Sequence, residues 1–429
     1  MTRMKESGID WIGQIPQEWE VIKFKYLGDV KQGLTYSPSD IVDKDEGILV
    51  LRSGNIQNGV LDFTNNVYVK TKVAESIVLR KNDILITARN GSSALIGKNA
   101  IIDTDIKATF GAFMMVFRTN KSLIAKFAFY LMNISFNFYR TFFTTSTVNQ
   151  LTAAIFNGIE VPLPSISEQQ KIADFLDKKT AQLDKVKSLL EEQIQKLKDY
   201  RSSLIYETVT KGLDKTVPLK DSGIDWIGQV PQGWGVKAIK YIFAEIGSGS
   251  TPKSDNEIFY DGDINWIQSG DLYQTDTVTS VSKTISYQGF KSTSALKIYQ
   301  PPFVALAMYG ASVGNVAVSY IDACVNQAVV VMLGASEKVR FGKYAIEASK
   351  SNLIFSAQGG TQPNISQNLI KNWSIPQPKS EEQVQIVDFL DKKTVQIDKL
   401  IQIKNEQIKN INKQQQTLIY DYVTGKRRV

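Results

Sequence analysis

The amino-acid sequence is duplicated, and this duplication restricts the possible folds more than any other feature. Residues 7–21 read SGIDWIGQIPQEWEV and residues 222–236 read SGIDWIGQVPQGWGV, so the two segments differ at three positions. The segment DFLDKKT at 174–180 returns unchanged at 388–394, an offset of 214 residues. Because an internal repeat is the sequence signature of a repeated structural unit, both halves of the chain should share one architecture.

The segments between the repeated blocks have diverged. LRSGNI at 51–56 is only faintly similar to IQSGDL at 267–272, and most side-chain identity in these regions is gone. A shared frame that carries dissimilar inserts favours one scaffold presenting two different recognition surfaces. The pattern therefore favours recognition over catalysis.

Each half begins with a region typical of a mixed globular domain. Short β-branched runs separated by Gly, Asn and Asp turns predict strands over 20–164 and 236–378. One helix is predicted in each region, at 124–143 and at 341–355. We therefore predict the α+β class, with two globular domains in tandem duplication.

Each half ends in a predicted long helix. Ser165 with Glu168, and Ser380 with Gln383, have the spacing of a capping box just after a proline-bounded stop. Apolar residues then recur every seven positions, as in a coiled coil. This predicted seam consists of Leu176, Leu183, Leu190, Leu197, Leu204, Leu390, Ile397, Ile411 and Leu418. The companion positions are Ile172, Val186, Tyr200, Ile386 and Leu400.

The two helices should bury these seams against each other. Related copies that pair through the same face do so about a pseudo-twofold axis, which makes the two long helices antiparallel. The predicted domains are globular regions at 1–164 and 216–378, joined by long helices at 165–215 and 379–429. Two end domains of this kind could read two half-sites on opposite strands of duplex DNA.

Composition excludes much of enzyme chemistry. The sequence has no histidine and one cysteine, Cys324, which removes Ser/His/Asp and Cys/His catalysis, zinc fingers and an internal disulfide. Carboxylates show no recognisable metal-binding spacing, so we expect neither a catalytic residue nor a metal site. The net charge of +7 is compatible with a phosphate-bearing partner. Without a secretion signal or a long apolar run, the chain is expected in the cytoplasm, with no membrane partner.

Three segments resemble cofactor-binding motifs but lack residues or spacings that those motifs require. GSSALIGK at 91–98 has five residues between its glycines, and Asn99 replaces the Ser or Thr of a phosphate loop. QPPF at 300–303 lacks the Asn or Asp that begins the tetrapeptide of adenine methyltransferases, and GSG at 247–249 stands alone. We therefore expect no cofactor in this chain.

Polar residues in the turn-rich parts of both globular regions are candidates for DNA contact. Arg, Gln and Asn pair with base edges, and Lys contacts phosphate. The candidates are Arg52, Arg89, Asn90 and Lys98 in the first half, and Lys253, Gln268, Tyr309 and Asn315 in the second. The alternative for each residue is an ordinary solvated loop position.

Several motifs together resemble the specificity subunit of type I restriction-modification systems. They are the tandem GIDWIGQ openings, the helix starts that read P-L/Q-P-x-x-x-E-Q-x-x-I-x-x-F-L-D, and the segments GSGSTP and GTQPNIS. The resemblance covers nearly the whole chain, in the same order and twice over. It implies two target recognition domains separated by two conserved helical regions.

The resemblance also implies a set of partners. Family members dock two methyltransferase subunits, largely through the helices, and further translocase-nuclease subunits complete the complex. Such a complex recognises a split sequence in double-stranded DNA, and the partner methylates its adenines at N6. The resemblance places S-adenosylmethionine, ATP and magnesium in the partner subunits, and it does not identify the residues that touch bases.

The sequence thus predicts a non-catalytic subunit that reads a bipartite DNA site and directs methylation and cleavage by other chains. Two alternatives stay open. One is a duplicated protein-interaction scaffold without DNA specificity, and the other is a self-sufficient methyltransferase. Lys31 to Thr35 replace the GSGSTP segment of the second half, so the first loop is expected to differ in geometry.

Overall fold

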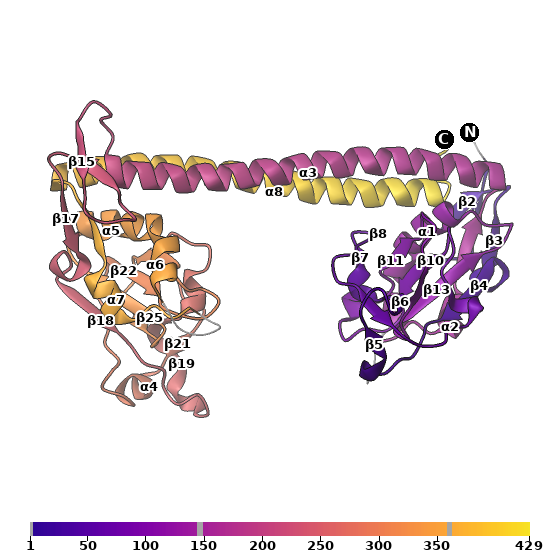
Figure 1. Ribbon diagram of the computed structural model, residues 1–429, viewed down its shortest axis with the longest axis horizontal. Coiled ribbons are helices and arrows are strands. Elements are labelled where there is room, and N and C mark those ends of the chain that lie inside the picture. Colours follow the sequence, from indigo (N-terminus) through magenta and orange to yellow (C-terminus); the bar gives the residue numbers. More distant parts are fainter. Residues whose placement is uncertain (1–2, 144–148, 358–362) are drawn as a thin grey trace. The chain divides into compact units, whose positions relative to one another are not determined.

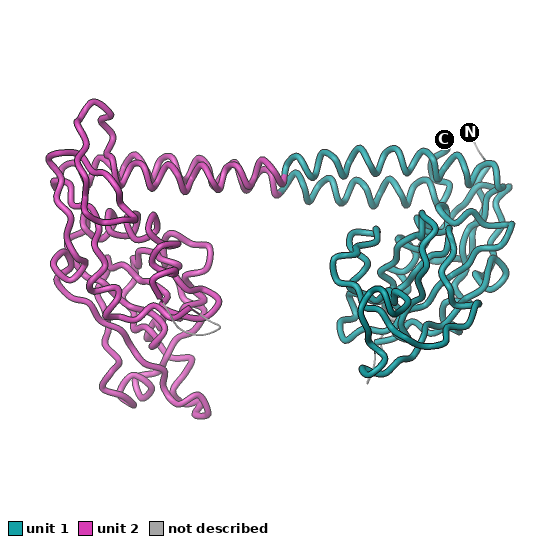
Figure 2. The backbone as a smooth tube through the Cα atoms, viewed as in Figure 1, with its two compact units in different colours: residues 1–190, 406–429 teal, residues 191–405 magenta. Residues whose placement is uncertain are grey.

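A computed structural model describes residues 3–143, 149–357 and 363–429 of the chain. The chain divides into two compact units, coloured separately in Figure 2. Unit 1 comprises residues 1–190 and 406–429, and unit 2 comprises residues 191–405. Each unit includes part of both long helices, whereas the domains expected from sequence separate the helices from the globular regions. The first residues of the GTQPNIS segment lie outside the described residues.

The two predicted long helices are α3 (Ile166–Lys211) and α8 (Ser380–Val423). The hydroxyl of Ser165 accepts a hydrogen bond from the backbone N–H of Glu168 at 3.3 Å, as in a capping box. The carboxylate of Glu168 does not close the box but accepts from the indole N–H of Trp19 at 3.0 Å. Glu382 does the same for Trp234 at 2.9 Å.

The capping box predicted between Ser380 and Gln383 is not formed. Gln383 donates its side-chain amide to the carbonyl of Pro378 at 2.9 Å, and Gln169 donates to Pro164 in the same way at 3.0 Å. The glutamate that corresponds to Glu168 is Glu382, one position earlier. The invariant E-Q pair of both helix starts thus fixes the tryptophan and the proline that precede each helix.

The helices run antiparallel within unit 1 (Figure 1). The rings of Phe175 and Tyr422 have centroids 4.5 Å apart. Further along, the amide of Gln415 donates to Asp184 at 3.3 Å. Rising residue numbers in α3 therefore meet falling numbers in α8.

Unit 2 shows the same direction of pairing. Lys404 donates to the side chain of Gln193. The guanidinium of Arg201 lies 3.3 Å from the carboxylate of Asp398. The antiparallel arrangement expected from the sequence is confirmed in each unit.

The predicted seam is buried or half-buried at all nine positions, and Leu176 and Leu390 are fully buried. Three companion positions were predicted wrongly, since Val186 is 46% exposed, Tyr200 is 55% exposed and Leu400 is 47% exposed. A straight helix drifts by about 20° per seven residues, so a strict seven-residue register leaves the contact face. Ile194 and Ile205 occupy the buried face instead.

The globular part of unit 1 contains two four-stranded sheets and a covering helix. The first has the order β11-β10-β13-β4, from Asn99–Ile101, Ile84–Thr87, Met114–Thr119 and Gly28–Gln32. The second has the order β12-β6-β9-β5, from Ala108–Phe110, Ile48–Leu51, Val67–Val69 and Ile41–Val42. The predicted helix at 124–143 is α1 (Ala125–Tyr139), which buries an aromatic face in the core.

Unit 2 contains a five-stranded and a three-stranded sheet. The larger has the order β18-β25-β22-β23-β20, from Glu245–Ser248, Val329–Leu333, Phe303–Ala307, Val316–Ser319 and Thr277–Val278. The smaller has the order β21-β19-β24, from Thr284–Ile285, Tyr260–Ile267 and Cys324–Val325. In both units one strand pair of the second sheet is parallel, β6 with β12 and β19 with β24.

The single helix predicted at 341–355 is two helices, α5 (Ser336–Ala348) and α6 (Lys350–Ser356). They meet at Ser349, which is buried and has a non-helical ψ of 2°. Its hydroxyl accepts from the indole N–H of Trp373 at 2.9 Å and donates to the carbonyl of Ile346 at 3.0 Å. This side-chain hydrogen bonding competes with the regular helix, a tendency of serine that the apolar pattern does not reveal.

The repeated sequence blocks form the same small elements in each unit. The opening blocks form the hairpins β1·β2 (Met4–Glu6, Gln14–Pro16) and β15·β16 (Leu219–Asp221, Gln229–Pro231). The next strands pair with those that precede the long helices, as β3·β14 (Glu20–Lys23, Glu160–Leu163) and β17·β26 (Gly235–Ala238, Ser374–Gln377). The tandem α+β duplication is confirmed.

The DFLDKKT block joins each globular part to its long helix. The hydroxyl of Tyr130 donates to Asp177 at 2.8 Å, and the hydroxyl of Tyr344 donates to Asp391 at 2.6 Å. Burial raises the pKa of both tyrosines, so both hydroxyls keep their protons for donation. The same contact thus uses the same aspartate of the block in both halves.

Candidate nucleic-acid interface

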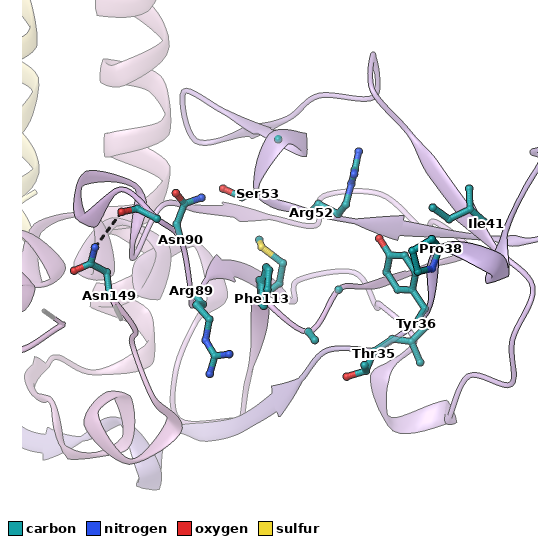
Figure 3. A pocket seen from close by; sticks show the side chains of 16 residues that line it. Thr35, Tyr36, Pro38, Ile41, Arg52, Ser53, Arg89, Asn90, Phe113 and Asn149 are labelled. Carbon is teal, nitrogen blue, oxygen red and sulfur yellow. Dashed lines mark hydrogen bonds between the residues drawn. The ribbon is translucent and has the colours of Figure 1, made fainter. Parts of the chain in front are cut away.

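A cavity of about 940 Å³ opens in unit 1 and collects three of the predicted DNA-contacting residues. Figure 3 shows Arg52, Arg89 and Asn90 around it, with Phe113 and Asn149 nearby. Much of the remaining lining is apolar, and among the described residues no acidic side chain lines the cavity. Concave sites of this kind, with few convergent polar groups, are the usual form of a binding site.

Arg52 is placed by the turn that ends β6. A short 3₁₀ helix (Ser53–Asn55) follows, and the backbone N–H of Arg52 donates to the side chain of Asn55 at 2.9 Å. The guanidinium donates to the carbonyl of Asn65 at 3.4 Å, and the side chain is exposed. The backbone is fixed while the charged end faces solvent.

Arg89 is held more tightly, just after β10. Its backbone N–H donates to the carbonyl of Phe113 at 3.0 Å, and its guanidinium donates to Gln150 at 2.8 Å. The guanidinium also lies 5.7 Å from the centre of the Phe113 ring, a cation–π distance. Asn90 accepts from the backbone of Ser92 at 3.0 Å, which closes a turn beside the cavity.

Lys98 does not line the cavity. Its ammonium donates to the carbonyl of Ser53 at 3.4 Å, in the turn that follows Arg52. Burial lowers the pKa of Lys98. The described geometry gives Lys98 a supporting contact to this turn.

Two glycines bring a loop close to the second sheet in each unit. A Cβ on Gly33 would lie 2.1 Å from the carbonyl oxygen of Gly111, and a Cβ on Gly249 would lie 1.7 Å from that of Val325. Only glycine permits this approach. The first loop was expected to differ in geometry from the second, but the close backbone approach of the glycine is shared by both loops.

The predicted residues of the two units occupy matched backbone positions. Arg52 directly follows β6, and Gln268 directly follows β19. Each backbone N–H is bonded by a side chain three residues later, Asn55 at 2.9 Å and Asp271 at 2.8 Å. The same turn thus presents a cation in unit 1 and a neutral amide in unit 2.

Arg89 and Tyr309 are matched in the same way. The residue before Arg89 donates to the carbonyl of Phe113 at 2.9 Å, and the residue before Tyr309 donates to that of Ala328 at 2.7 Å. Phe113 and Ala328 are therefore also equivalent. Arg89 beside the ring of Phe113 in unit 1 therefore corresponds to Tyr309 beside the methyl group of Ala328 in unit 2.

Lys98 and Asn315 form a third matched pair. The carbonyl of Lys98 accepts from Thr87 at 2.8 Å, and that of Asn315 accepts from Ala307 at 2.9 Å. The side chain of Asn315 accepts from Lys350 at 2.6 Å. Asn315 lines a different cavity, of about 680 Å³, which α3 and α8 also line.

The surface around Tyr309 is a chain of neutral polar groups. Thr251 donates to the side chain of Gln327, and a side-chain hydrogen bond also links Gln327 to Tyr309. Lys253 is exposed two residues beyond Thr251. Gln268 keeps a buried amide nitrogen without a hydrogen-bond partner among the described residues.

A charged network in the second cavity joins the globular part of unit 2 to its helices. Arg201 of α3 pairs with Asp276 at 2.6 Å, with Glu347, and with Asp398. Lys343 pairs with Asp276 and Glu347, each at 2.7 Å. Burial opposes ionisation of Asp276, but Lys343 and Arg201 outweigh it and lower its pKa. The network joins the globular part of unit 2 to α3 and α8.

Sequence reasoning missed Phe113, Gln150, Thr251 and Gln327. Phe113 and Gln327 lie just before the strands β13 and β25. A turn exposes side chains there, but the adjoining apolar sequence predicts a buried strand. Phe113 is 61% exposed, an unusual state for a large aromatic residue. Alignment of the two strand ends could have revealed both positions.

The described residues contain no group of three or more acidic or thiol side chains able to hold a metal ion. In the same residues, no helix is long and apolar enough to cross a membrane.

Comparison with known proteins gives a consistent family. The model of the type I restriction modification DNA specificity domain matches residues 16–198 and 231–413. The StySPI specificity subunit of Salmonella potsdam is 30% identical over 219 residues, which cover 50% of this chain and 47% of that protein. The EcoKI specificity subunit of Escherichia coli is 31% identical over 198 residues, covering 45% and 43%. This chain thus spans about half the length of these two relatives.

Other similarities extend over the whole chain. The putative MjaX specificity subunit of Methanocaldococcus jannaschii is 25% identical over 439 residues, covering 97% of this chain and 96% of that protein. A chain from a solved structure of a type I R-M system has a TM-score of 0.71 at 18% identity, covering 96% and 99%. The HsdS subunit from Thermoanaerobacter tengcongensis has a TM-score of 0.50 at 17% identity, covering 96% and 98%. At these identities the solved structures show the fold alone.

Proposed function

The chain belongs to the type I restriction-modification DNA specificity family, and from this membership we propose that it reads a bipartite site in double-stranded DNA for separate methyltransferase and nuclease subunits. Each unit supplies one reading surface, and each surface recognises one half-site. The complex methylates adenine at N6 and cleaves DNA through its partner chains. The proposed substrate places the complex in the cytoplasm.

The observation that supports this function best is the matched frame of the two reading surfaces. Equivalent hydrogen bonds from backbone N–H groups hold Arg52 and Gln268, and Arg89 and Tyr309, at the same places in the two units; the acceptors are side chains for the first pair and backbone carbonyls for the second. The scaffold is kept, whereas the side chains with hydrogen-bonding capacity differ. Two homologous readers with different side chains suit a target whose halves differ in sequence.

The proposed partners dock on the long helices. Apolar side chains remain exposed there, and such surfaces mark interaction sites. They are Val186, Leu189 and Tyr200 on α3, and Val395, Leu400 and Ile403 on α8. Two methyltransferase subunits would cover this surface, and translocase-nuclease subunits would join the assembly. S-adenosylmethionine, ATP and magnesium belong to these partners in the proposal, and this chain is not itself an enzyme.

The test is single-base mapping of N6-methyladenine in the native organism with and without the gene. We expect deletion to erase one split motif, which would reveal both half-sites and their spacer. Unchanged maps, together with salt-independent binding of the purified complex to DNA, would contradict the proposal and favour a protein-interaction scaffold. Calorimetric binding of S-adenosylmethionine to this chain alone would instead indicate a self-sufficient methyltransferase.

A further inference from the structure

We propose that the cavity of unit 1 is a guanine-reading site, in which the guanidinium groups of Arg89 and Arg52 donate to the O6 and N7 acceptors of guanine in one half-site. This inference rests on the proposed function, because it takes duplex DNA as the ligand. It assigns the guanine-containing half-site to unit 1 and identifies specificity-determining positions in the chain.

The charges in this cavity are not neutralised by its lining. Of the described residues that line it, Arg52 and Arg89 are the two that carry a charge, and both are exposed. The side-chain hydrogen bonds that hold them go to the neutral groups Asn65 and Gln150. Both cations therefore remain available to a ligand rich in acceptors. The O6 and N7 edge of guanine is such a ligand, and arginine is its commonest partner.

Arg89 has the geometry of a pre-organised reader. Its backbone is bonded to Phe113, whose ring lies under the guanidinium, and Gln150 holds one end of the group. A guanidinium has five N–H donors in a planar fork, so this restraint leaves further donors free to pair. Restricting the side chain before binding lowers the entropic cost of the contact.

The matched positions of unit 2 cannot make the same contact. Gln268 stands in place of Arg52 and Tyr309 in place of Arg89. Ala328 replaces the aromatic platform, and the nearby amide belongs to Gln327. Glutamine pairs with the N6 and N7 edge of adenine rather than with guanine. The arginine fork is therefore confined to unit 1 among these matched positions.

The experiment uses the full chain assembled with its methyltransferase partners. The wild-type split motif is first read from the N6-methyladenine map, and binding is then measured on duplexes that carry each base at each motif position. We expect Arg89→Gln to reduce discrimination by roughly 5- to 150-fold at one G·C pair of one half-site. Gln327→Ala should alter only the other half-site, and Arg80→Gln, outside the cavity, should alter neither.

Arg89→Lys separates base reading from a simple phosphate contact. Lysine keeps the charge but loses the planar fork, so it should relax the same G·C pair as Arg89→Gln does. Wild-type discrimination in Arg89→Lys would overturn the inference, as would a relaxed A·T pair or a motif without a G·C pair in that half-site. Unchanged discrimination in both Arg89→Gln and Arg52→Gln would also overturn it. A wild-type complex that binds no split motif refutes the proposed function itself.

Discussion

Replacement of Arg201 should destabilise unit 2. Its side chain is 16% exposed and pairs with three carboxylates, of which Glu347 is 21% exposed and Asp398 is 50% exposed. The matched position in unit 1 is Gln415, which donates to Asp184 as a neutral group. Arg201→Gln therefore places the neutral residue of unit 1 among the carboxylates of unit 2.

The expected loss of stability follows from burial. Removing one partner of a buried ion pair costs about 3–5 kcal/mol, because the other charges stay buried without compensation. Asp398 is half exposed and adds little, and Asp276 is 37% exposed, so we expect the low end, about 3 kcal/mol. For a unit of this size, that loss lowers the melting temperature by roughly 6–12 °C.

Calorimetry of the full chain measures this shift. Lys196→Gln is the matched control, because Lys196 lies on the same helix and its pair with Glu192 is exposed to solvent. It should leave the melting temperature unchanged. In a Glu347→Gln background the cost of Arg201→Gln should fall, since part of the unpaired charge is already gone. Equal melting temperatures for Arg201→Gln and Lys196→Gln would refute the reasoning.

Three further outcomes are expected. Leu390→Ala should lower the free energy of unfolding in urea by about 2–5 kcal/mol, because Leu390 is fully buried in the core of unit 2. Leu400→Ala, at an exposed position, should lower it much less, and similar losses for the two variants would contradict the proposed seam. The pKa of Asp276 is lowered, so its ionised form stabilises the fold above about pH 4, the ordinary value, and this contribution is lost on further acidification. The penalty of Arg201→Gln should then shrink in acidic melts; a penalty independent of pH would exclude this origin. Burial raises the pKa of Cys324 to about 12, so iodoacetamide at pH 8 should label it only after unfolding, as mass spectrometry can check.

The local sequence pattern determined the elements that depend on interactions between residues close in the chain. The repeated blocks predicted the tandem architecture, and the apolar spacing predicted both long helices and the buried positions Leu176 and Leu390. Burial of an apolar stripe depends on the period of the helix itself, so the pattern is readable without a partner. The same pattern failed at Val186, Tyr200 and Leu400, because the drift of a straight helix against a seven-residue repeat emerges only along its whole length.

Part of the candidate interface could also be predicted. Arg52, Arg89 and Asn90 were recognisable from residue type and turn context, and the structure brings them to one cavity. Phe113 was not recognisable, because its neighbours in the sequence read as a buried strand. Its exposure depends on the turn that precedes β13, which the pairing with β10 and β4 sets.

The sequence by itself determined that the chain is a duplication of one α+β plan with two long amphipathic helices, and that histidine chemistry is absent. Only the tertiary structure decided that Arg89 and Tyr309 are equivalent positions with different side chains. That equivalence is carried by backbone hydrogen bonds between segments far apart in the chain, such as those to Phe113 and Ala328. Backbone groups are the same in every residue, so side-chain identity can diverge while the contacts that align the two surfaces persist.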